Sequence, residues 1–211
     1  MCHRRARSRP GSKAMKIDYP HLVDLALAVA AAAHASQNRK DKTRTTPYIA
    51  HPSMVGYLLR DAGFDDEVVA AGILHDTVED TTVSVADIER DFGARVSVLV
   101  SAVTEHDKSL PWETRKAQYL DHLAETSIDA LAIAAADKLH NTRSILGAMD
   151  RLHAAGDDPE GVWSSFKRGK QASVGFLRKA NLRIAQRAGE DARLRRLNDA
   201  LSLALDELEA G

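Results

Sequence analysis

The chain has 211 residues, of which 44% are hydrophobic and 28% are charged, a composition typical of a folded globular protein rather than a disordered one. Lysine and arginine number 29 against 30 aspartate and glutamate, and the resulting net charge of −1 argues against a generally basic nucleic-acid-binding protein. The single cysteine, Cys2, excludes a disulfide framework and a cysteine-based zinc site, and it suits the cytosol.

The amino-terminal residues differ in composition from the rest of the chain. Residues 1–14 are rich in arginine and lack apolar periodicity, so we expect a disordered tail there, with Met15 as an alternative start. We expect residues 15–211 to form a single domain that ends in helices. The longest apolar run, Leu25–Ala33, has nine residues, fewer than the roughly 20 that a transmembrane helix needs, so no membrane association is expected.

Apolar residues recur at the three- and four-residue spacing of an α-helix along nearly the whole chain. In chain order, this pattern predicts helices over 20–37, 53–62, 66–78, 85–92, 94–104, 113–125, 127–149, 161–188 and 190–208. Gly63 is a predicted helix stop, and Asp65 and Ser127 are predicted N-caps. Strand-like alternation is absent and an aromatic content of 5% is low for a β domain, so we predict a compact all-α bundle of about eight helices.

Three polar segments interrupt this apolar pattern, at 48–52, 74–80 and 136–141. Buried polar groups are costly unless they are paired, so these segments indicate a site. Their histidines and carboxylates provide the mixed nitrogen and oxygen ligands that Mn²⁺, Fe²⁺ or Zn²⁺ accept. We therefore predict a metal site formed by four side chains, His51, His75, Asp76 and Asp137.

Local geometry limits how these side chains can meet. His75 and Asp76 are adjacent and point about 100° apart on a straight helix, so both reach one ion only near a helix end. Taken singly, the histidines also have structural explanations, His51 before Pro52 as a helix cap and His75 as a hydrogen-bonded core residue. Asp137 interrupts an apolar run and needs a metal or a buried arginine as its partner.

A second acidic pair, Glu79 and Asp80, follows the predicted ligands at 75–76 by four residues. This spacing places the pair about one helical turn from the predicted metal. Carboxylates there can position and deprotonate an attacking water or protonate a leaving oxygen. The alternative is a solvated helix end without a chemical role.

The same residues lie in motifs that resemble the HD-domain hydrolases of the RelA/SpoT homologue family. The motifs are PYIxHP at 47–52, LHDTVEDT at 74–81, KSLPWExRK at 108–116 and ADKLHNxR at 136–143. The similarity covers about residues 20–185 and is greatest to the stand-alone small alarmone hydrolases, including the metazoan SpoT-like type. Motifs in this order and at these separations are specific to that branch, whereas a single His-Asp pair is not.

The resemblance implies an all-helical fold around one Mn²⁺ bound by the four predicted ligands, with another divalent transition metal as the alternative. It implies hydrolysis of the 3′-diphosphate of guanosine tetra- or pentaphosphate with release of pyrophosphate. In the family, the acidic pair matching Glu79 and Asp80 handles the water and the proton transfers. Tyr48 either packs in the core or stacks on the ligand, and the other residues expected at the nucleotide are Arg39, Lys40, Asn141 and Arg143.

Some features depart from the family pattern or are left open by the sequence. His140 stands where the metazoan type has tyrosine, and Lys138 is expected to point away from Asp137 on its helix. The alternative functions are hydrolysis of another nucleotide, either a nucleoside phosphate or the 2′-phosphate of a nicotinamide dinucleotide, and non-catalytic nucleotide sensing. We expect a small nucleotide as partner and the cytoplasm as compartment, while formation of a homo-oligomer stays open.

Overall fold

The computed structural model describes residues 21–40, 45–105, 108–189 and 191–210. The tail predicted over 1–14 and the alternative start at Met15 lie outside these residues. Within them the chain forms ten α-helices and one 3₁₀ helix, which confirms the predicted all-α class with more helices than expected. Extended backbone pairs there only at an isolated antiparallel bridge between Asn38 and Pro47, and none of the helices is long and apolar enough to cross a membrane.

Most of the observed helices agree with the predicted ones, although α1 ends at Ala33 rather than near residue 37 and α8 continues to Ala154 rather than ending near residue 149. The predicted segment 85–92 coincides with α5, and Asp65 and Ser127 cap α3 and α8 by accepting backbone hydrogen bonds at 3.1 and 3.2 Å. Gly63 ends α2 with a positive φ of 95°, which glycine adopts without steric cost. The bounds are α1 His21–Ala33, α2 Ala50–Ala62, α3 Asp66–Leu74, α4 Thr77–Asp80, α5 Val85–Phe92, α6 Ala94–Val103, α7 Trp112–Leu123, α8 Ile128–Ala154, η1 Pro159–Ser165, α9 Gly169–Ala188 and α10 Ala192–Ala210.

The helix predicted over 66–78 is interrupted by a turn. Helix α3 ends at Leu74 and α4 begins at Thr77, so His75 and Asp76 form the turn between them. The Thr77 hydroxyl donates to the Leu74 carbonyl over 2.6 Å and so satisfies an acceptor at the end of α3. Val78 follows Leu74 by four residues, so the helical spacing of apolar residues spans the break and had concealed it.

The helix predicted over 161–188 begins later than expected. Residues Pro159–Ser165 form a 3₁₀ helix capped by Asp158, whose carboxylate accepts a hydrogen bond from the backbone N–H of Glu160 over 3.0 Å. Helix α9 starts only at Gly169, where φ is +70°. The 3₁₀ segment forms part of the cavity described below.

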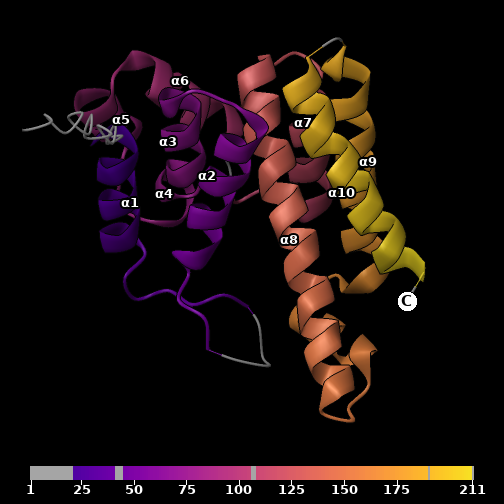
Figure 1. Ribbon diagram of the computed structural model, residues 1–211. Helices are drawn as coiled ribbons and strands as arrows, with labels where there is room; N and C mark the ends of the chain where they lie inside the picture. The colour runs from indigo at the N-terminus through magenta and orange to yellow at the C-terminus, as the bar shows by residue number, and fades with distance from the viewer. Residues whose placement is uncertain (1–20, 41–44, 106–107, 190, 211) are drawn as a thin grey trace, which may run out of the picture.

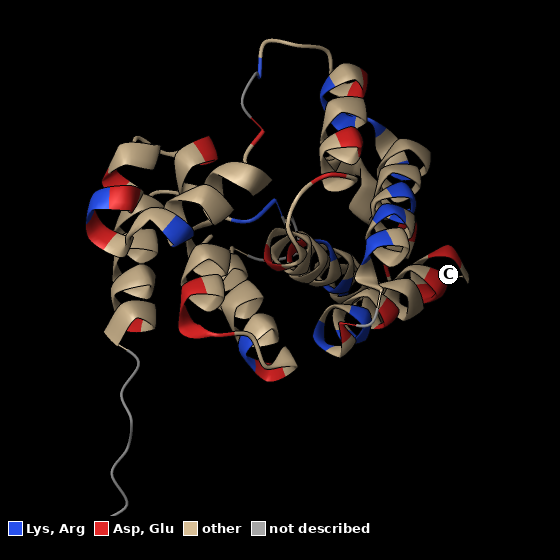
Figure 2. Cartoon of the chain, turned by 90° about the horizontal axis from the view of Figure 1, so that it is seen from above, with Lys and Arg blue, Asp and Glu red and all other residues tan. Residues whose placement is uncertain are grey.

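Helix α8 runs between two groups of helices, with α1–α6 on one side and α9 and α10 on the other (Figure 1). The larger core packs α1–α3, α5 and α6 against the first half of α8, including Ala130 and Ala136, and also contains residues of α7, α9 and α10. A smaller core packs the second half of α8, through Ile145 and Met149, against η1, α9 and α10. Asp137 lies on α8 where these two cores adjoin. Positively and negatively charged residues occur on the helices of both groups (Figure 2).

Two glycines allow α2 and α3 to pack closely. A Cβ atom at Gly72 would lie 2.2 Å from Cδ1 of the buried Leu59, and one at Gly56 would lie 2.5 Å from Cγ1 of Ile73. Gly72→Ala is therefore expected to lower the free energy of unfolding by about 1–3 kcal/mol, measured by urea denaturation. Gly175→Ala in α9 is the matched control, because its Cβ meets nothing within 4 Å. A Gly72→Ala protein as stable as the unsubstituted chain would contradict this packing.

Candidate active site

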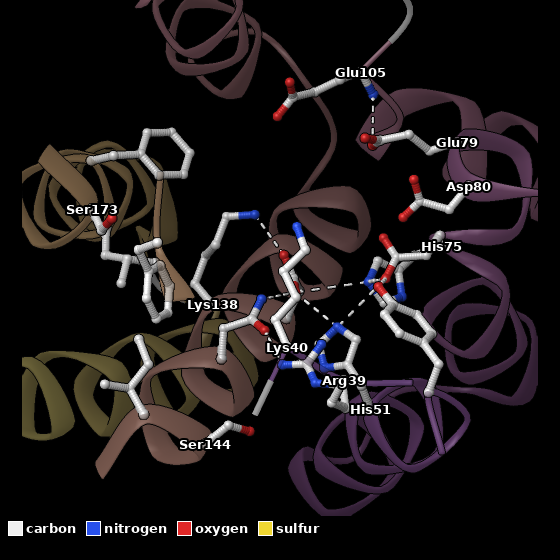
Figure 3. A pocket seen from close by; sticks show the side chains of 18 of the residues that line it. Arg39, Lys40, His51, His75, Glu79, Asp80, Glu105, Lys138, Ser144 and Ser173 are labelled. Atoms are coloured by element: carbon white, nitrogen blue, oxygen red, sulfur yellow. Dashed lines mark hydrogen bonds and ion pairs between the residues drawn. The ribbon is translucent and has the colours of Figure 1, made fainter. Parts of the chain in front are cut away.

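The three polar segments predicted from the sequence meet in one place (Figure 3). His51 stands in the first turn of α2, and Asp137 lies within α8. The turn between α3 and α4 brings His75 and Asp76 to the same point, as their adjacency had required. Ligand atoms of His51, His75 and Asp137 all lie within 4.8 Å of one another.

Two imidazole nitrogens face the same carboxylate oxygen in this cluster. Nε2 of His51 lies 3.1 Å and Nε2 of His75 lies 3.8 Å from Oδ1 of Asp137. Oδ2 of Asp76 lies 3.0 Å from the His75 nitrogen and 3.6 Å from the His51 nitrogen. The histidines and Asp137 are buried. Buried nitrogen and carboxylate donors that converge in this way form a set that a divalent transition metal accepts.

The hydrogen bonding of His75 indicates whether these residues fit a metal ion. Its Nδ1 donates to the carbonyl of Gly72 over 2.8 Å, which leaves Nε2 unprotonated when the ring is neutral. Among the described residues, this buried Nε2 has no hydrogen-bond partner of suitable geometry. Because a buried polar atom without a partner is costly, a ligand is expected to meet it. The residues present therefore fit a metal ion.

Both aspartates are held in the ionised form that ligates metals. Burial would raise the pKa of Asp137, but the ammonium of Lys138 and the neighbouring imidazoles hold it well below its usual value. Burial also opposes ionisation of Asp76, yet the neighbouring imidazoles of His75 and His51 lower the pKa of this carboxyl. A proton therefore does not compete strongly with a cation for either carboxylate.

Lys138 lies in the site, so the prediction that it points away from Asp137 is wrong. Its Nζ is 2.5 Å from Oδ2 of Asp137 and 4.7 Å from the centre of the Tyr119 ring. Consecutive helical residues point about 100° apart, but the long lysine stem brings the ammonium back to its neighbour. Burial would lower the pKa of Lys138, and the Asp137 carboxylate raises it instead, so the side chain stays charged.

Three residues predicted at the nucleotide are linked to the cluster by hydrogen bonds. The Arg39 guanidinium donates to Oδ1 of Asn141 over 2.6 Å and lies 5.5 Å from the centre of the Tyr48 ring. The Asn141 amide donates to Asp137 over 2.5 Å, and the Tyr48 hydroxyl donates to Asp76 over 2.5 Å. A guanidinium held beside an aromatic ring suits contact with a purine or a phosphate.

The remaining two residues predicted at the nucleotide occupy different positions. Lys40 is exposed and lines the cavity. Arg143 is exposed and is not among the cavity residues, and its Nη1 lies 3.8 Å from Oε2 of Glu207. Six residues along a helix correspond to a rotation of about 240°, so Arg143 faces away from Asp137 and does not reach the site in this structure.

Glu79 and Asp80 line the cavity beside the ligand cluster. Oε2 of Glu79 accepts a hydrogen bond from the backbone N–H of Glu105 over 3.3 Å, and burial raises the pKa of Glu79. Asp80 is more exposed, and its Oδ1 lies 2.5 Å from Nζ of Lys108. The pair combines a sheltered carboxyl with an ion-paired carboxylate, an arrangement that suits an acid and a base acting in one reaction.

The cavity has a volume of about 730 Å³ and two kinds of wall. The ligand cluster and the charged residues form the polar wall. The aromatic wall, which was not predicted, comes from α7, η1, the residue after η1 and α9. It consists of the aromatic Trp112, Phe166 and Phe176 and the aliphatic Val162 and Leu177. A cavity with one polar and one aromatic wall fits a molecule that carries both phosphates and a ring system.

A divalent metal is expected to stabilise the protein measurably. Binding to the folded state alone adds about 2.7 kcal/mol when the free metal concentration is 100 times Kd. For a chain of this length, that free energy corresponds to a rise in Tm of about 5–11 °C. Thermal unfolding followed by circular dichroism in Mn²⁺ and in EDTA measures this rise, and equal Tm values would contradict a metal site.

Comparison with known proteins places these residues in a family. A family model described as an HD domain matches residues 26–171, which include all four predicted metal ligands. The guanosine-3′,5′-bis(diphosphate) 3′-pyrophosphohydrolase MESH1 of Danio rerio is 38% identical over 160 residues, covering 75% of this chain and 85% of the relative. The Homo sapiens protein of the same name is 44% identical over 118 residues, covering 55% of this chain and 65% of that protein.

Solved structures show the same likeness over a larger part of the chain. A metazoan orthologue of SpoT that is described as hydrolysing ppGpp superimposes with a TM-score of 0.64 at 30% identity, covering 95% of this chain and 96% of that chain. The lmo0812 protein of Listeria monocytogenes gives a TM-score of 0.63 at 33% identity, covering 76% of this chain and 96% of its own. The chain therefore belongs to the HD-domain family, and its homologues include the small MESH1-type hydrolases.

Proposed function

We propose that the protein hydrolyses the 3′-diphosphate of guanosine 3′,5′-bis(diphosphate) and releases pyrophosphate, with Mn²⁺ as its metal. One observation carries this proposal, namely that the ligand cluster, the acidic pair Glu79 and Asp80, and several cations share one cavity. The relatives that are named for this activity or described by it support the choice of substrate. The protein composition, with a single cysteine, supports a cytoplasmic location.

The residues that would hold the metal are His51, His75, Asp76 and Asp137. A divalent metal in this position supplies a Lewis acid that lowers the pKa of water and withdraws charge from phosphoryl oxygens. Asp76 is included because its carboxylate lies within 3.6 Å of both ligand nitrogens. The mixed donor set also admits Fe²⁺ or Zn²⁺, so the choice of Mn²⁺ rests on the family resemblance.

The acidic pair would move the protons of the reaction. Water attacks the phosphorus bonded to the 3′ oxygen, the bond between that phosphorus and the 3′ oxygen breaks, and the pyrophosphoryl group passes to water. The Asp80 carboxylate, exposed to solvent and oriented by Lys108, accepts the proton of the water. Glu79, whose pKa is raised by burial, suits the delivery of a proton to the leaving 3′ oxygen.

The two walls of the cavity would bind different parts of the substrate. Arg39 and Lys40, on the connection between α1 and α2, provide positive charge for phosphates beside the metal site. Asn141 holds the Arg39 guanidinium in place over 2.6 Å, so the cation is preorganised rather than freely mobile. The aromatic wall offers apolar surface to the nucleoside.

A substrate panel with product analysis tests the proposed function. The purified protein in Mn²⁺ is expected to convert guanosine tetraphosphate to GDP and pyrophosphate. Release of orthophosphate from a nucleoside phosphate or from the 2′ position of a nicotinamide dinucleotide, with guanosine tetraphosphate untouched, would assign the cavity to another phosphohydrolase reaction. Nucleotide binding without any turnover in Mn²⁺, Fe²⁺ or Zn²⁺ would identify a sensing module instead.

A further inference from the structure

His140, which follows Asp137 by three residues on α8, contacts the metal-ligand candidate His51 directly. Their Nδ1 atoms are 2.7 Å apart, their ring centres are 4.9 Å apart, and the ring planes are tilted by 35°. Two unprotonated ring nitrogens at this distance would repel each other through their lone pairs, so a hydrogen lies between them. One histidine is therefore the donor and the other is the acceptor.

The ligand role of His51 determines the direction of this hydrogen bond. A ring nitrogen that binds a metal is unprotonated, and Nε2 is the nitrogen of His51 that faces Asp137 at 3.1 Å. A neutral imidazole carries one hydrogen, so a His51 ring with a free Nε2 carries its hydrogen on Nδ1. His51 then donates to Nδ1 of His140, which carries its own hydrogen on Nε2.

The second histidine of the cluster has a partner in the corresponding place. His75 donates from its Nδ1 to the Gly72 carbonyl over 2.8 Å, which orients the ring and frees its Nε2. Metal-ligating histidines generally use such an acceptor to fix the tautomer and the orientation of the ring. Within the part of the chain that the structure describes, the residue that forms a hydrogen bond with Nδ1 of His51 is His140.

We propose that His140 is a positioning residue for the metal site, which holds His51 in the metal-binding tautomer by accepting a hydrogen bond from its Nδ1. The inference rests on the proposed metal site but not on the identity of the substrate. It also gives a role to a histidine at a position where the sequence departs from the tyrosine of the metazoan type. Loss of such a partner generally weakens metal affinity about 10–100-fold.

Two substitutions distinguish the effect of the hydrogen-bond acceptor on His140 from the effect of the size of its side chain. His140→Leu removes the acceptor, whereas His140→Asn places a carbonyl oxygen close to the position of Nδ1. We expect Kd for Mn²⁺, measured by competition with a chelator, to rise about 10–100-fold in the leucine variant and to stay within about threefold of the unsubstituted value in the asparagine variant. His153→Leu, at an exposed position of the same helix, is the matched control and should leave Kd unchanged.

Nitrogen-15 NMR of the unsubstituted protein loaded with Zn²⁺ provides a second readout that needs no variant. We expect the imidazole of His51 to be protonated at Nδ1 and that of His140 at Nε2. A hydrogen on Nδ1 of His140, or unchanged affinity in a folded His140→Leu protein, would overturn the inference. Failure of the unsubstituted protein to bind either metal would overturn both proposals, whereas normal metal binding without guanosine tetraphosphate hydrolysis would overturn only the proposed function.

Discussion

Replacement of Asp76 by alanine is expected to lower kcat/KM for guanosine tetraphosphate by more than about 10³-fold. The carboxylate lies within 3.6 Å of the Nε2 atoms of His51 and His75, and it accepts a hydrogen bond from the Tyr48 hydroxyl. The substitution therefore removes a proposed ligand together with its negative charge. A Lewis acid supplies several kcal/mol of transition-state stabilisation, and each loss of about 1.36 kcal/mol slows the reaction tenfold. Steady-state measurement of pyrophosphate release in Mn²⁺ gives the comparison.

A control separates this effect from general destabilisation. Asp24 is an exposed carboxylate on α1, away from the cavity residues, and Asp24→Ala should keep the kinetics of the unsubstituted protein. Circular dichroism and thermal unfolding establish that both variants are folded. A folded Asp76→Ala protein that retains full metal-dependent turnover is incompatible with Asp76 as a ligand.

Replacement of Glu79 by glutamine is expected to lower kcat by about 10²–10⁴-fold, the usual contribution of a positioned acid or base. The amide keeps an oxygen that can accept the Glu105 backbone hydrogen bond, but it cannot exchange a proton with the substrate. Because Glu79 is not a proposed ligand, the rise in Tm caused by Mn²⁺ should persist. Single-turnover kinetics and thermal unfolding in Mn²⁺ together separate chemistry from metal binding.

The matched control for this substitution is an exposed glutamate. Glu89 lies on α5 and does not line the cavity, so Glu89→Gln should change neither kcat nor the effect of the metal on Tm. If Glu79→Gln instead abolished the stabilisation by Mn²⁺, Glu79 would contribute to the metal site. If it left kcat unchanged, the proton transfers would have to be assigned to other groups.

Sequence patterns predicted most of the fold because helix boundaries depend largely on local interactions. The caps formed by Asp65 and Ser127 lie within three residues of the N–H groups that they satisfy, so their residue types indicate helix starts. The break after Leu74 was missed because Val78 follows Leu74 at the four-residue spacing of a continuous helix. There Nε2 of His75 lies 3.8 Å from Oδ1 of Asp137 on a distant helix, and this contact has no signature in the local periodicity.

The candidate site was predictable to the extent that its residue types conflicted with their surroundings. Asp137 stood out because a carboxylate in an alanine-rich run needs a partner, and the structure brings it to His51. The position of the Lys138 ammonium depends on the path of a flexible stem, which residue spacing does not fix. The aromatic wall joins Trp112 with Phe176, which are distant in the sequence. Both side chains are apolar, so neither stands out from the sequence pattern as Asp137 does.

Because α8 passes both cores, the proposed chemistry and the proposed nucleoside contact come from different parts of the fold. The proposed metal ligands and the acidic pair lie on α2, α4, α8 and the turn between α3 and α4, whereas most of the aromatic wall belongs to α9, to η1 and to the residue that follows η1. A chimaera that takes residues 159–188 from a homologue would exchange the surface proposed to face the nucleoside, while the proposed reacting centre kept its own scaffold. Such modularity gives this architecture a simple route to new phosphorylated substrates.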